Sequence, residues 1–126
     1  MPTKIEIILA GVCLRGELAD TDCAKAIAAL LPIEAVPNEW GDEFYFEIPL
    51  RMDLDETATR RVKAGDIGFW PPGNALAIFF GPTPMSRGKE PVPASAVNIV
   101  GTIQGDPAVL TRAKGSGKIR MERTQQ

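Results

Sequence analysis

Hydrophobic and polar residues alternate along most of this chain, which is the pattern of half-buried β-strands. In the first run, for example, Ile5, Ile7 and Leu9 share one face. Ala10-Gly11 then joins two such runs as a hairpin turn. Gly101 indicates a β-bulge or a close backbone approach in a later run. The pattern predicts strands at residues 4–9, 12–18, 43–48, 97–103 and 118–122, and two more within 67–80 that Pro71-Pro72-Gly73 separates.

Two short segments have helical spacing instead. Thr21 or Asp20 can cap a helix over residues 21–31, and Pro32 ends it. Its apolar positions recur at i, i+3, i+4 and i+7: Ala24, Ile27, Ala28 and Leu31. Asp106, followed by Pro107, is the cap of a second helix over residues 106–113. Many short strands with two short helices indicate a β-barrel or closed sandwich that carries helical caps.

Two further segments lack a regular period. Residues 53–66 are the most polar part of the chain, and we expect an extended, solvent-facing piece there. Residues 81–95 contain four prolines and two glycines, which is too many for a helix or a central strand. We expect an ordered surface loop, and long loops of this kind are often functional. Gly115-Ser116-Gly117 predicts a turn into the last strand.

Composition narrows the possible functions. The 126 residues predict a single domain, residues 1–126, and the net charge of −2 excludes a basic nucleic-acid footprint. Histidine is absent, so an imidazole base or a histidine metal ligand is impossible, and we expect neither a metal nor a cofactor. Cys13 and Cys23 form no disulfide framework, and no apolar run is long enough for a signal peptide or a membrane span. We therefore expect a cytoplasmic protein that does not act on membranes.

Two groups of residues are candidates for chemistry. Glu39, Asp42 and Glu43 flank Trp40, and paired carboxylates can serve as an acid and a base when their surroundings differ. The same residues are also consistent with a polar turn. Trp40 either covers an edge of the core or lines a groove. A second aromatic group, Phe69, Trp70, Phe79 and Phe80, is core in most of its members, but Trp70 can form the floor of a concave site.

The order of these motifs resembles a compact cyclophilin. The likeness is strongest to small prokaryotic cyclophilin-like proteins of unassigned function, which have three characteristic stretches. In this chain they are WGDEFYFEIP at residues 40–49, GDIGFWPPG at 65–73 and FFGPTP at 79–84. The resemblance implies a mainly β fold, a closed antiparallel eight-stranded barrel capped by two short helices.

The same resemblance does not imply prolyl isomerase activity. Cyclophilins bring an arginine and a histidine to the proline-binding groove, but residues 39–48 contain neither. The later histidine of cyclophilins falls on Val97, and their groove glutamine falls on Ile78. Of the groove residues, only Phe80 keeps its type. The arginine matters because it polarises the prolyl amide, whose rotation barrier is about 18–20 kcal/mol.

These observations predict a binding module for a small ligand or an extended peptide, without catalytic residues. The predicted ligand-binding residues are Trp40, Glu43, Trp70, Phe80, Thr83, Ser86 and Asn98. One alternative is an enzyme, either a residual peptidyl-prolyl isomerase or a hydrolase that uses Glu39, Asp42 or Glu43. A structural subunit that offers a flat apolar patch is a third possibility. The oligomeric state is left open.

Overall fold

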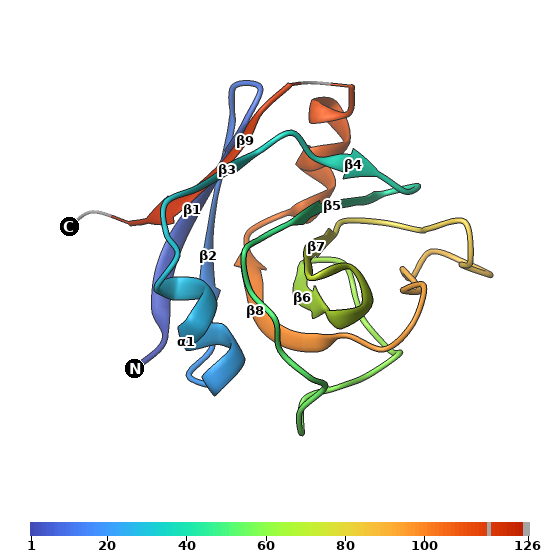
Figure 1. Ribbon diagram of the computed structural model, residues 1–126. Coiled ribbons are helices and arrows are strands. Elements are labelled where there is room, and N and C mark those ends of the chain that lie inside the picture. The colour runs from blue at the N-terminus through green and yellow to red at the C-terminus, as the bar shows by residue number, and fades with distance from the viewer. Residues whose placement is uncertain (116, 125–126) are drawn as a thin grey trace.

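One curled antiparallel sheet forms most of the molecule (Figure 1). The computed structural model describes residues 1–115 and 117–124, so Ser116 of the predicted turn lies outside the described residues. The order of the nine strands across the sheet is β3-β9-β1-β2-β8-β6-β7-β5-β4. The strands are β1 Thr3–Leu9, β2 Val12–Leu18, β3 Ile33–Ala35, β4 Asn38–Glu39, β5 Glu43–Glu47, β6 Asp66–Trp70, β7 Ala75–Phe79, β8 Asn98–Gln104 and β9 Ile119–Arg123.

The mainly β fold is thus confirmed, but the prediction of a closed eight-stranded barrel is wrong. The sheet is an open half-barrel, and its edges are the very short strands β3 and β4. These two strands follow each other in the chain, joined by Val36-Pro37. The first pairs with β9 and the second with β5, so the segment passes from one edge of the sheet to the other. Pro37 has no N–H to donate to a neighbouring strand, so the strand pairing of the chain is interrupted between β3 and β4.

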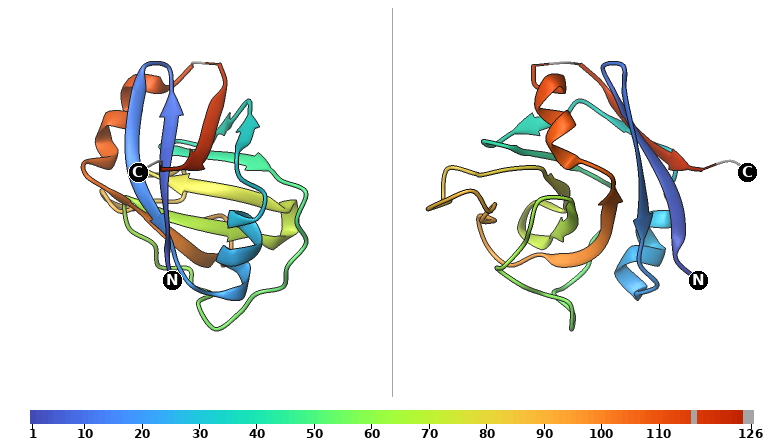
Figure 2. Two further views of the ribbon diagram at one scale, coloured as in Figure 1. Left: turned by 90° about the vertical axis from the view of Figure 1, so that its left-hand side faces the viewer. Right: turned by 180° about the vertical axis from the view of Figure 1, so that it is seen from behind.

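The sheet curls because β8 changes direction along its length. Figure 2 shows β1, β2 and β9 running nearly across the direction of β5, β6 and β7, with β8 passing between the two groups. Ile67 pairs with Gly101 and Gly68 pairs with Ile99, so Val100 is an extra residue in β8. This is the bulge that Gly101 predicts. A Cβ atom on Gly101 would lie 2.5 Å from the carbonyl oxygen of Glu17, so the close approach of β2 also requires glycine.

The two predicted helices are both present. Helix α1, Asp22–Ala28, begins after Thr21, whose hydroxyl accepts a hydrogen bond of 3.1 Å from the Ala24 amide. The second is a 3₁₀ helix, η2, Pro107–Ala113, where the Asp106 carboxylate accepts from the Ala108 amide. A further 3₁₀ turn, η1, Pro71–Gly73, joins β6 to β7. No helix in residues 1–115 and 117–124 is long and apolar enough to cross a membrane.

Apolar residues pack on both faces of the central strands. The main core lies inside the curl and contains Phe44, Phe46, Phe69 and the buried face of α1. A smaller cluster on the other face of β7 contains Val62, Ala77, Phe79 and Val97. Two long loops cover this second face, one before β6 and one after β7 (Figure 1).

Asn98 holds the first of these loops against β8. Its side chain is fully buried, and its Oδ1 accepts a hydrogen bond of 2.8 Å from the Asp55 amide. Its Nδ2 donates to the carbonyl of Asp53 at 3.0 Å. Farther along, Thr59 and Val97 form a β-bridge. The polar segment 53–66 is therefore attached to the sheet. It contains turns at residues 56–57 and 64–65, and it is solvent-facing only in part because Val62 is buried.

We expect Asn98→Ala to lower the free energy of unfolding by about 1–3 kcal/mol, because it removes two hydrogen bonds that a fully buried side chain makes to the backbone of the 53–55 segment. Urea denaturation measures this loss. Thr102→Ala, on the exposed face of the same strand, is the matched control and should stay within about 0.5 kcal/mol of the parent chain. Equal stability of the two variants would contradict the anchoring role of Asn98.

Candidate functional site

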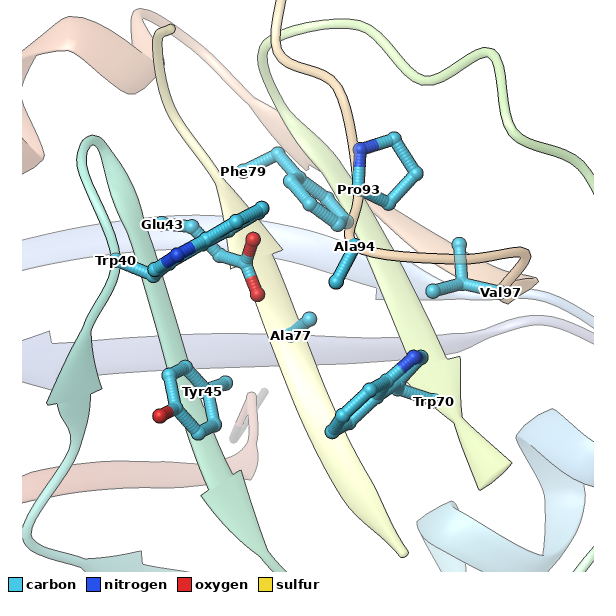
Figure 3. Close-up of a pocket in the computed structure, with 9 residues that line it drawn as sticks. All are labelled: Trp40, Glu43, Tyr45, Trp70, Ala77, Phe79, Pro93, Ala94 and Val97. Carbon is cyan, nitrogen blue, oxygen red and sulfur yellow. The ribbon is translucent and has the colours of Figure 1, made fainter. Parts of the chain in front are cut away.

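A hollow of about 210 Å³ lies on the outer face of the sheet, above the middle of β7 (Figure 3). The register of β5, β6 and β7 determines which residues form the floor of this hollow. Tyr45 of β5 and Gly68 of β6 both pair with Ala77 of β7, and Glu43 pairs with Phe79. Because Ala77 is small and Gly68 has no side chain, larger neighbours surround a low point in the surface. The lining residues are Trp40, Glu43, Tyr45, Trp70, Ala77, Phe79, Pro93, Ala94 and Val97.

The walls come from a hairpin turn and from the proline-rich loop. Trp40 lies at the turn between β4 and β5, where its amide donates to the Glu43 carbonyl at 3.0 Å. Pro93 and Ala94 lie on the opposite side of the hollow (Figure 3). The loop and the turn are connected, because the Asp42 amide donates to the Pro82 carbonyl at 2.9 Å. The expectation that residues 81–95 form an irregular loop is confirmed, and this loop contributes to the site.

Trp70 forms the remaining wall at the end of β6. Its indole Nε1 donates to the hydroxyl of Ser95 at 2.7 Å, so one hydrogen bond sets the ring's orientation. The backbone of Gly73 lies against the ring. A Cβ atom there would be 2.8 Å from Cζ3 of the indole, too close for any residue except glycine unless the ring moves. Trp70 is half-buried, so part of its surface is available to a ligand.

Glu43 is the one carboxylic acid that lines the hollow. Its side chain points between Trp40 and Trp70 (Figure 3), and the residue is only 8% exposed. Its Oε1 is buried and has no hydrogen-bond partner among the described residues. Burial among apolar groups raises the pKa of Glu43 from 4.5 to about 7. The hollow is therefore an apolar site with one titratable group that is half ionised near neutral pH.

The other two members of the acidic cluster have different surroundings. The Asp42 carboxylate forms an ion pair of 2.9 Å with Lys114. Glu39 accepts a hydrogen bond from the Gly115 amide. Neither residue is part of the pocket lining. The acidic side chains thus diverge from the turn, and Glu43 has no second carboxylate beside it in the hollow.

Thr83 and Ser86 organise the proline-rich loop rather than the surface of the hollow. The Thr83 hydroxyl donates to the Val92 carbonyl, and the Thr83 amide donates to the Ser86 hydroxyl at 2.9 Å. Ser86 in turn donates to the Glu90 carbonyl at 2.7 Å. These contacts tie the two ends of the loop together just before Pro93. Thr83 and Ser86 therefore contribute to the site indirectly, because they hold the part of the loop that places Pro93 and Ala94 in the wall of the hollow.

Phe80 and Asn98 lie away from the hollow. Phe80 is buried in the main core, with its ring centroid 4.7 Å from that of Phe44. It faces inward because β7 alternates and Phe79 takes the outward position. Asn98 anchors the 53–55 segment. Of the seven predicted ligand-binding residues, the hollow brings together Trp40, Glu43 and Trp70.

Sequence reasoning missed most of the floor. Tyr45 shares a strand face with Glu43, and Phe79 with Ala77, so the alternation that assigns these faces could have identified them. The sequence contains no such indication for Pro93, Ala94 and Val97, because they lie outside the regular strands and no hydrophobic period assigns them to a face. A stronger signal was available in the aromatic residues. Both tryptophans and the one tyrosine of the chain line this hollow.

Comparison with known proteins places the chain in a family. The family model described as "Cyclophilin-like" matches residues 3–122. The chain is similar to the solution structure of the hypothetical protein AF2241 from Archaeoglobus fulgidus, with 32% sequence identity and a TM-score of 0.80. That match covers 98% of this chain and 95% of the archaeal one. A search of curated proteins found no match. The chain belongs to the cyclophilin-like family.

Proposed function

We propose that this protein is a binding module without prolyl isomerase activity, and that the hollow above β7 is its ligand site. The observation that carries the proposal is the Oε1 atom of Glu43, which is buried and has no hydrogen-bond partner among the described residues, in a pocket otherwise lined by aromatic and aliphatic groups. An apolar pocket with one directed polar group is the usual form of a small-molecule site. A bound ligand would supply the partner that the carboxyl lacks.

The dimensions favour a small ligand over an extended peptide. Pockets that enclose drug-sized molecules have volumes of roughly 300–1,000 Å³. The hollow, at about 210 Å³, is smaller and is walled by Trp40 on one side and by Pro93 and Ala94 on the other. It can enclose a small molecule, or a single side chain of a larger partner. A peptide backbone would have to lie outside these walls.

The composition of the pocket argues against isomerase chemistry. Polarising a prolyl amide requires a strong hydrogen-bond donor at its oxygen or nitrogen. The lining residues contain neither arginine nor lysine, so no cationic donor is available to a prolyl amide in the hollow. Arg87 lies in a separate depression of the proline-rich loop, with Met85 and Val92. Arg51 and Arg60 are exposed.

The hydrolase alternative needs two carboxyl groups at one cavity. The ion pair of Asp42 with Lys114 and the contact of Glu39 with Gly115 keep both groups out of the hollow. Glu43 has the raised pKa that acid–base catalysis uses, but it has no second carboxyl beside it in the hollow. Its surroundings offer no nucleophile among the lining residues other than the phenol of Tyr45. A binding role accounts for the site with fewer assumptions.

The isomerase alternative has a direct test. In a protease-coupled assay with a proline-containing peptide, we expect the rate of cis–trans conversion to equal the uncatalysed background, because the hollow has no cationic donor to polarise the amide. Increasing protein concentration should leave this rate unchanged. An acceleration that is proportional to protein concentration and that survives repurification would contradict the proposal.

The binding proposal is tested by a screen of small aromatic and aliphatic compounds. Both tryptophans line the hollow, so their fluorescence reports directly on its occupancy. We expect ligands to be found, and Trp70→Ala to weaken their binding at least about tenfold because an aromatic wall supplies much of the contact area. Trp40 still reports in this variant. A large fall in melting temperature with unchanged affinity in the folded fraction would assign Trp70 to the core instead.

Burial of Glu43 also predicts a pH-dependent stability. Between pH 4.5 and about 7 the folded state binds more protons than the unfolded state, so the free energy of unfolding decreases as the pH rises through this range. The full shift corresponds to roughly 3 kcal/mol. We expect Glu43→Gln to be increasingly stabilising, relative to the parent chain, from pH 5 to pH 8. Urea denaturation at both values measures the difference.

Glu47→Gln is the matched control, since Glu47 lies on the same strand and is exposed. Its stability relative to the parent chain should be the same at pH 5 and pH 8. If Glu43→Gln behaved in the same way, the carboxyl of Glu43 would have to be solvated, and the apolar character of the site would be wrong.

A further inference from the structure

We propose that the hollow selects a small organic cation, an alkylammonium or trimethylammonium group, which pairs with Glu43 between the rings of Trp40 and Trp70. This inference rests on the proposed binding function and specifies its ligand class. Three features of the site carry it: an unpaired acidic group, aromatic ring faces around it, and a shortage of other polar atoms.

The first feature is the lack of a positive partner for Glu43. The nearby ammonium group of Lys114 is engaged by Asp42 at 2.9 Å. Glu43 forms no ion pair with any residue that the structure describes, and burial raises the pKa of its carboxyl. A buried carboxyl is normally paired with a cation or satisfied by several hydrogen bonds. Here a ligand of positive charge would complete the site.

The second feature is the aromatic surround. Trp40 lies over the Glu43 carboxyl, Tyr45 and Trp70 flank the low point at Ala77, and Phe79 lies behind (Figure 3). The faces of aromatic rings carry negative potential, which attracts ammonium groups, most strongly at tryptophan. A ring surround combined with a carboxylate is therefore complementary to an organic cation in both shape and charge. An anionic ligand would meet repulsion from both elements.

The third feature excludes a metal ion as the occupant. Calcium takes six to eight oxygen ligands, and magnesium requires near-octahedral oxygen coordination. Glu43 is the one carboxylate in the lining, and the Tyr45 hydroxyl points away from it (Figure 3). No group of three acidic or cysteine side chains that could hold a metal occurs among the residues that the structure describes. An alkylammonium ion, in contrast, needs few oxygen ligands because its carbon atoms pack against apolar surface.

The pairing gives binding a defined pH dependence. A bound cation favours the ionised form of Glu43, so affinity should rise as the pH increases from 5.5 to 8. Few other groups can contribute. Tyr45 is the other titratable side chain in the lining, Asp42 on the turn is already paired with Lys114, and the lining residues from β6, β7 and the proline-rich loop carry no charge.

The test uses two probes of the same shape that differ in charge. Choline has a permanent positive charge, and 3,3-dimethylbutan-1-ol is its neutral carbon isostere. We expect titration calorimetry at pH 8, with tryptophan fluorescence in parallel, to show at least about tenfold tighter binding of choline, the smallest effect typical of a desolvated pair of charges. The pair benzylamine and benzyl alcohol repeats the comparison for a primary ammonium group.

Two variants locate the effect. Glu43→Gln keeps the shape and the aromatic rings but removes the charge. It should abolish the pH dependence and reduce the preference for the cation to the part that the rings supply, less than about threefold. Glu47→Gln, with the same change of net charge on the exposed part of β5, should retain both. At pH 5.5, choline should bind the parent chain about tenfold more weakly than at pH 8, since most of Glu43 is then protonated.

The outcomes separate the cation inference from the binding function. Equal binding of charged and neutral probes, with a tryptophan response, would overturn the cation inference and leave the binding module in place. A preference of the same size in Glu43→Gln would also overturn it, because the charge of Glu43 would then have no part in selecting the cation. If neither member of either pair binds, the cation inference fails, and the compound screen independently decides the binding function.

Discussion

Strand β7 buries side chains on both of its faces, and the rest of the architecture follows from this constraint. Leu76 and Ile78 face the main core, while Ala77 and Phe79 face outward, yet all four are buried. In an open sheet, apolar residues on the second face must be covered by something other than a strand. The segments before β6 and after β7 provide this cover through Val62, Pro93 and Val97. Where the cover is incomplete, above Ala77, the hollow remains.

The covering loops are held by polar residues that make specific contacts. Asn98 fixes the 53–55 segment, and Thr83 and Ser86 close the proline-rich loop on itself. Hydrogen bonds of this kind, made to backbone groups in partly buried positions, order segments that have no regular pairing of their own. Thr83, Ser86 and Asn98, which the sequence predicts to be ligand contacts, therefore hold the covering loops in place and do not line the hollow. Only side chains on the outward faces of β5, β6 and β7 and at the loop rims reach the hollow itself.

Most of the fold could be predicted from the sequence, because a period of two and the capping residues Thr21 and Asp106 are local signals. The open form of the barrel could not. It depends on β3 and β4, which are too short to show a period. The site could be predicted in part: Trp40, Glu43 and Trp70 stand out chemically, whereas Phe79 and Phe80 are adjacent phenylalanines whose faces depend on the register with β5. Strand register and loop contacts are long-range properties that no local pattern contains.

The position of Glu43 connects stability with the proposed function. A carboxyl buried without a partner destabilises the folded chain once it ionises, and an apolar side chain of similar size would avoid that cost. The surroundings are otherwise well ordered, since Trp70 is held by Ser95 and Gly73 and the hairpin turn is held by Pro82. The apolar surround keeps the carboxyl desolvated, and these contacts set the positions of the groups around it. Such preorganisation strengthens the interaction with a ligand that complements the charge, because less is lost in ordering the site on binding. In the proposed function, the same burial that weakens the free protein therefore strengthens the pairing of this one carboxyl with a ligand.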